Sequence, residues 1–123
     1  MRIPKKTLDE RIPQAINLIR NSFPGGPNMV IKISKTDKGH SNAFGANMVM
    51  SSPLMAAILL KKNAVNVYQI FGELFKIQIA STSTIDLIDY LTGLAGNVSS
   101  KVRMDLAVTT VALKMALRTF PEL

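Results

Sequence analysis

The chain has no cysteine in 123 residues, and this absence constrains its fold more than any other feature of the sequence. Disulfide scaffolds, thiol catalysis and most structural zinc sites are excluded, so neither covalent bridges nor a zinc site can replace a hydrophobic core. A chain of this length can bury enough apolar surface to fold without them. Because hydrophobic residues make up 47% of the sequence, we expect a single domain over residues 1–123, with a short basic N-terminal arm at residues 1–6.

Helical spacing of apolar residues is clearest near the N-terminus. Ile12, Ile16 and Ile19 recur at intervals of three and four, which predicts a helix over residues 8–22 that ends at a Pro/Gly-rich segment. Ser52 followed by Pro53 has the pattern of an N-cap and first helical residue. Further helices are predicted at residues 53–63, 84–94 and 99–120.

Alternating apolar and polar residues predict strands in the middle of the chain. Phe75, Ile77 and Ile79 alternate with Lys76 and Gln78, as expected for a half-buried strand. Together with the helices, the strands predict an α+β fold: a small antiparallel sheet of about four strands, helices packed on one face, and two C-terminal helices. The predicted strands are residues 29–34, 43–50, 65–71 and 74–80, with a polar turn at residues 36–42.

The excess positive charge lies entirely in the first half of the chain. Residues 1–62 hold ten basic residues and three acidic ones, whereas residues 63–123 hold five of each. A concentration of one sign of charge favours an anionic partner.

The predicted sheet would place basic residues on its open face. Lys32 and Lys76 would point away from the apolar side, where they can contact a phosphate backbone, and Tyr68 on a neighbouring strand can stack a base. The alternative is the ordinary solvated face of an antiparallel sheet, and lysines at a helix C-terminus also complement the helix dipole. The predicted nucleic-acid-binding residues are Lys5, Lys6, Lys32, Lys35, Lys38, Lys61, Lys62, Tyr68 and Lys76.

The last predicted helix has a basic side and a wide apolar side. Arg103, Lys114 and Arg118 share one side of it. The apolar side suits either the core of the chain or contact with a second copy. The predicted oligomer interface consists of Val108, Val111, Leu113, Met115 and Leu117.

No catalytic, metal or cofactor site is predicted. His40 has Asp37 and Ser41 close by in one predicted turn, and neighbouring turn residues seldom reach the geometry of a catalytic triad. The longest apolar run, residues 53–60, is far shorter than the roughly 20 residues of a membrane span. We therefore expect a non-secreted protein, located in the cytoplasm or a virion, without a membrane span.

Two functional hypotheses follow. The preferred one is a non-enzymatic, oligomeric protein that binds RNA or DNA with little sequence specificity, such as a nucleocapsid-like or coat-like packaging component of a virus or mobile element. The alternative is a structural or adaptor protein whose basic N-terminal half docks an acidic protein partner. The two differ in salt dependence, because contacts to phosphates weaken steeply as salt rises.

Overall fold

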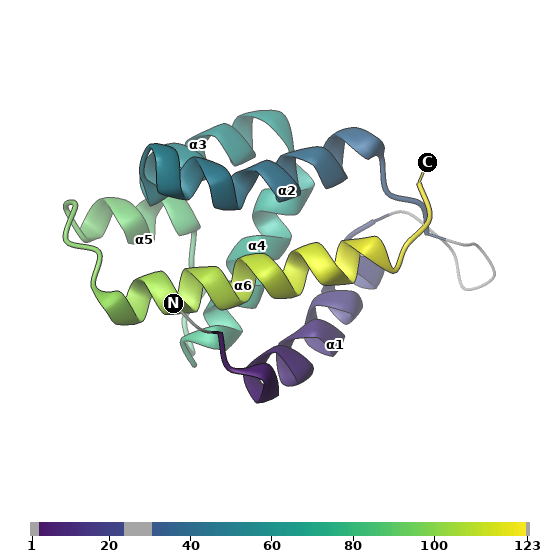
Figure 1. Cartoon of the computed structure of the whole chain (residues 1–123), viewed down its shortest axis with the longest axis horizontal. Helices are drawn as coiled ribbons and strands as arrows, with labels where there is room; N and C mark the ends of the chain where they lie inside the picture. The colour runs from purple at the N-terminus through teal and green to yellow at the C-terminus, as the bar shows by residue number, and fades with distance from the viewer. Residues whose placement is uncertain (1–2, 24–30, 123) are drawn as a thin grey trace.

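The computed structural model describes residues 3–23 and 31–122, and over these ranges the chain is a bundle of helices (Figure 1). The helices are α1 (Lys5–Ser22), α2 (Lys35–Met50), α3 (Pro53–Asn63), α4 (Val65–Gln78), α5 (Leu87–Gly93) and α6 (Ser100–Arg118). The predicted α+β fold is therefore wrong: the described residues contain no strand, only an isolated parallel bridge between Ile33 and Glu122. The beginning of the predicted strand 29–34 lies outside the described residues.

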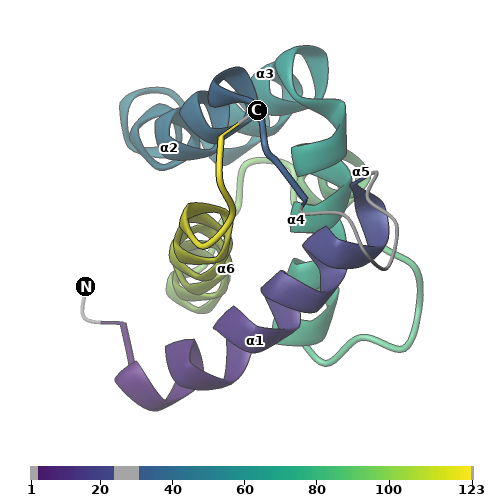
Figure 2. The same cartoon turned by 90° about the vertical axis from the view of Figure 1, so that its right-hand side faces the viewer.

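Helix α6 organises the bundle. It runs along the long axis of the molecule, and α1, α2 and α4 all pack against it (Figures 1 and 2). Helices α2 and α3 form a hairpin on one side, and α5 packs mainly against α3. An aromatic cluster lies inside, where the ring centroid of Phe71 is 4.7 Å from that of Phe44 and 6.5 Å from that of Phe75.

The strands predicted at residues 65–71 and 74–80 are one helix, α4. Its buried side chains include Val67, Phe71 and Leu74, which recur at intervals of four and three residues and so share one face. A helix can bury that whole face between α1, α3 and α6, whereas two short strands would need partners for their backbone groups.

Gly72, which falls between the two predicted strands, lies buried within α4. A Cβ atom at this position would stand 3.4 Å from the carbonyl oxygen of Ile85. At that distance a Cβ atom would make an ordinary van der Waals contact, so α4 packs directly against the segment that leads into α5.

The predicted turn at 36–42 and strand at 43–50 are also wrong, because these residues form α2. The helix begins with a side-chain cap, in which the Oγ of Ser34 accepts a hydrogen bond of 3.0 Å from the backbone N–H of Asp37. Its apolar residues are few, and Phe44 is the large one that reaches the core. Packing against α3 and α6 stabilises α2, although the spacing of its apolar residues did not predict a helix.

Four helices were predicted with approximately correct positions. Helix α3 has the predicted bounds, and Ser52 caps it by accepting a 3.1 Å hydrogen bond from the N–H of Met55. Helices α5 and α6 lie within their predicted ranges. Helix α1 begins earlier than predicted, so Lys5 and Lys6 belong to its first turn. Among the described residues, no helix combines the length and the apolar character that crossing a membrane requires.

Candidate nucleic-acid interface

A hollow of about 350 Å³ lies between the first turns of α2 and the last turns of α6. Four basic side chains from these two helices line it, and Glu122 is the acidic residue in its lining. The basic residues are Lys35, Lys38, Lys114 and Arg118. The hollow therefore carries an excess of positive charge supplied by two segments that are far apart in the sequence.

Helical spacing places these charges on one side of each helix. Lys35 and Lys38 are three residues apart in α2, and Lys114 and Arg118 are four apart in α6. The N-terminal end of α2 also presents the positive end of its helix dipole at this edge of the molecule. Both effects favour an anion in the hollow.

The chain segment after α6 fixes the relative position of the two helices. Lys38 donates a 2.6 Å hydrogen bond from Nζ to the carbonyl oxygen of Phe120. Just beyond it, the backbone N–H of Ile33 donates a 2.9 Å hydrogen bond to the carbonyl oxygen of Pro121. The side chains of Lys35 and Arg118 are exposed, so they can reach a ligand without breaking either bond.

The remaining predicted lysines are spread over the surface. Lys61 and Lys62 are exposed in the last turn of α3, and Lys76 is half-buried in the last turn of α4. Lys32 is exposed just before α2. No sheet face joins Lys32 to Lys76 in the described residues, so that part of the prediction is wrong.

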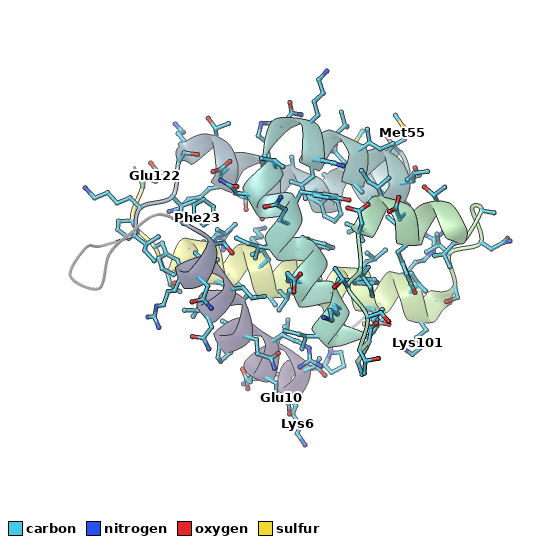
Figure 3. All side chains as sticks on the ribbon, turned by 180° about the vertical axis from the view of Figure 1, so that it is seen from behind. Lys6, Glu10, Phe23, Met55, Lys101 and Glu122 are labelled. Carbon is cyan, nitrogen blue, oxygen red and sulfur yellow. The ribbon has the colours of Figure 1, made fainter. Side chains whose placement is uncertain are left out.

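The lysines at the start of α1 also lie apart from the hollow. Figure 3 shows Lys6 at the lower tip of the molecule, well away from Glu122. Both Lys5 and Lys6 are exposed. Neither lysine lines the basic hollow.

Tyr68 is buried and does not present its ring to solvent. Its hydroxyl donates a 2.6 Å hydrogen bond to Asp86 Oδ1 and accepts one of 3.0 Å from the N–H of Ile88. Burial, with the bond to Asp86, raises the pKa of Tyr68 to about 12. The Nζ of Lys61 stands 5.6 Å from the ring centroid. This tyrosine stabilises the fold, and in this conformation it cannot stack on a base.

The residues predicted for an oligomer interface divide between the core and the surface of α6. Val108, Leu113 and Leu117 are buried within the chain, and Val111 is half-buried. Met115 is 43% exposed. Most of this apolar side therefore packs against the other helices of the same chain.

Another apolar surface, which the sequence analysis did not single out, lies on the α2–α3 hairpin. Val49 and Met50 at the end of α2 are 86% and 85% exposed, and α3 adds exposed Met55, Ile58 and Leu59. Figure 3 shows Met55 at the opposite end of the molecule from Glu122. The part of this surface around Met55 therefore lies at the opposite end of the molecule from the basic hollow.

Lys114 and Arg118 were not among the predicted binding residues. Their spacing on the last helix was visible in the sequence, but their position beside α2 depends on the packing of the whole bundle. Arg103, on the same predicted side, lies near the other end of α6. No family model, curated protein or solved structure matches this chain, so its function must be inferred from this geometry.

Proposed function

We propose that this protein binds nucleic acid without catalysing a reaction, through contacts to phosphates and with little sequence specificity. The observation that supports the proposal is the convergence of Lys35, Lys38, Lys114 and Arg118 around one hollow, in which Glu122 is the one acidic residue among the described residues of the lining. Lysine and arginine contacts to phosphates position a protein on nucleic acid but do not read its sequence. The hollow is the anchoring point in this proposal.

The distribution of the other lysines favours a long polyanion over a compact acidic protein. Lys61 and Lys62 lie on α3, and Lys5 and Lys6 lie at the start of α1, away from the hollow. A nucleic-acid strand carries a phosphate at every nucleotide and can follow such dispersed charges over the surface. An acidic protein partner, the alternative hypothesis, would contact one patch.

Self-association is a further part of the proposal, and the apolar surface of the α2–α3 hairpin supports it. Exposed apolar residues that cluster on one surface are typical of protein–protein contacts. Because Met55 lies at the end opposite Glu122, contact between copies around Val49, Met50 and Met55 would leave the basic hollow open to nucleic acid. This arrangement suits a packaging protein.

A matched pair of charge reversals tests the binding site. Arg118 and Arg103 are both exposed arginines of α6, and only Arg118 lines the hollow. We expect Arg118→Glu to weaken binding of a fluorescently labelled single-stranded 12-mer by about tenfold, measured by anisotropy, which corresponds to ~1.4 kcal/mol. Arg103→Glu should weaken it much less. Equal losses would show that overall charge, and not this hollow, determines binding.

Light scattering with absorbance at 260 and 280 nm tests the proposal on the purified protein. The chain has no tryptophan and two tyrosines, so co-purified nucleic acid would dominate the signal at 260 nm. We expect a multimer whose 260 nm absorbance is removed by high salt. A monomer that never carries nucleic acid would favour the adaptor hypothesis.

A further inference from the structure

A second hollow, of about 260 Å³, lies between α2 and α3. Its lining combines an apolar floor with polar groups. The floor includes Phe44, Ala56 and Leu60, all buried in the core. His40, Asn47 and Asn63 supply the polar groups around it. A concave apolar surface with a few polar groups around it is the usual form of a small-ligand site.

The polar side chains of this hollow are available for a ligand. Each of His40, Asn47 and Asn63 can donate one hydrogen bond and accept another. Among the described residues, none of the three side chains takes part in a hydrogen bond. These groups can therefore form hydrogen bonds with the polar edge of a flat molecule whose face contacts Ala43 and Leu59, the exposed apolar residues of the lining.

Helix α2 contributes to both hollows. Lys35 and Lys38 line the basic hollow, whereas His40 and Asn47 of the same helix line the second one. On the other side of the second hollow, Asn63 directly follows the exposed pair at residues 61–62. Lys62 is three residues after Leu59, which also lines the second hollow, so these two side chains share one face of α3.

We propose that the hollow between α2 and α3 takes one unstacked base of a single-stranded nucleic acid, an inference that rests on the function proposed above. A nucleobase has two apolar faces and a polar edge, which match the floor and the polar groups of this hollow. Lys62 on α3 would contact a flanking phosphate. A duplex cannot present such a base, because its bases are paired and stacked.

Two probes of equal length separate the base from the phosphates. One is a single-stranded DNA 12-mer of mixed sequence, and the other is the same backbone with every base removed. Because stacking of one base contributes measurably to affinity, we expect the wild-type protein to bind the intact probe about 5-fold to 100-fold more tightly than the abasic one.

A substitution that fills the hollow should remove this difference. Ala43 lines the hollow and is exposed, so Ala43→Leu adds volume there without displacing a core side chain. We expect it to reduce binding of the intact probe to the abasic level and to leave binding of the abasic probe unchanged. Ala46→Leu is the matched control, because Ala46 is an exposed alanine of α2 outside the lining. Asn47→Ala provides a second variant should Ala43→Leu fail to fold.

The outcomes distinguish this inference from the function on which it rests. Equal affinity of the wild-type protein for both probes would overturn the base site and leave phosphate binding in place. If neither probe binds, the proposed function fails and the base site fails with it. A loss of the preference for bases in Ala46→Leu as large as in Ala43→Leu would also overturn the inference, because that residue lies outside the hollow.

Discussion

Tyr68 Oη donates a 2.6 Å hydrogen bond to Oδ1 of Asp86, and this bond joins α4 to the start of α5. The other oxygen of the same carboxylate caps α5 by accepting a 3.1 Å hydrogen bond from the N–H of Asp89. The tyrosine hydroxyl also accepts a hydrogen bond from the N–H of Ile88. One buried side chain therefore completes the N-terminal cap of a helix that has only seven residues.

Removing this hydroxyl should destabilise the fold. We expect Tyr68→Phe to lower the free energy of unfolding by about 1.5–3 kcal/mol, since it removes a part-buried hydrogen bond to a charged group. Urea denaturation followed by circular dichroism measures the loss. Tyr90→Phe is the control, because it keeps the ring whose centroid lies 5.3 Å from that of Phe75. Equal losses in the two variants would contradict this role of the Tyr68 hydroxyl.

The same pair makes stability depend on pH at both extremes. The hydrogen bond from Tyr68 lowers the pKa of Asp86 below its usual 3.8, so its stabilisation is present above about pH 4 and is lost as the pH falls through the lowered pKa. The pKa of Tyr68 is raised from 10.0 to about 12, so its stabilisation is complete below pH 10 and is lost as the pH rises toward 12.

The stability difference between the wild-type protein and Tyr68→Phe should therefore be largest and constant between about pH 4 and pH 10. It should shrink on either side of this plateau. Urea denaturation of both proteins at a series of pH values measures it. A difference that stays constant from pH 3 to pH 12 would show that the pair contributes no pH dependence.

A polar network links α6, α4 and α1 through Asp105. Its Oδ1 accepts a 3.0 Å hydrogen bond from Gln78 Nε2, and Gln78 Oε1 accepts a 2.7 Å bond from Arg11 Nε. Asp105→Ala leaves the part-buried Gln78 amide without this acceptor, so we expect a loss of about 1–3 kcal/mol in unfolding free energy. Lys101→Ala should lose less, because the lysine of the Lys101–Asp105 pair is 79% exposed. A larger loss for Lys101→Ala would contradict this network.

The two sides of α6 should respond differently to truncation. Leu113 is 1% exposed, so Leu113→Ala should cost about 2–5 kcal/mol in unfolding free energy through lost burial and the cavity left behind. Met115→Ala, at an exposed position, should cost much less. Thermal denaturation at several protein concentrations checks both. A loss of thermal stability that depends on protein concentration and occurs only in Met115→Ala would show that this side of α6 lies in a contact between copies.

The sequence predicted helices where either a capping pattern or a periodic apolar face was visible. Ser52 and Pro53 defined α3, and the isoleucines of α1 defined its buried side. The alternation of Phe75, Ile77 and Ile79 wrongly predicted a strand, because a five-residue alternating pattern also fits the last turns of a helix whose buried face ends there. Helix α2 was missed because its glycines and polar residues hide any period, and its neighbours stabilise it.

The residues of the candidate site were only half predictable for a similar reason. Lys35 and Lys38 were among the predicted residues because charge is visible in the sequence, although the turn predicted at residues 36–42, which would hold Lys38, is part of a helix. Lys114 and Arg118 reach the same hollow through packing of α6 against α2, which depends on long-range contacts that no local pattern reveals. Tyr68 was selected as an aromatic residue on a predicted strand. These residues form α4 instead, and Tyr68 lies on the buried side of that helix.

The slope of log affinity against log salt tests the central claim most directly. For single strands each phosphate contact contributes about 0.7 to the magnitude of this slope. We expect Arg118→Gln to reduce the magnitude by about that amount for a single-stranded 12-mer, because one contact in the basic hollow is lost. Arg103→Gln, at the other end of the same helix, should keep the wild-type slope. Identical slopes for wild type and Arg118→Gln would show that the hollow between α2 and α6 does not bind phosphate.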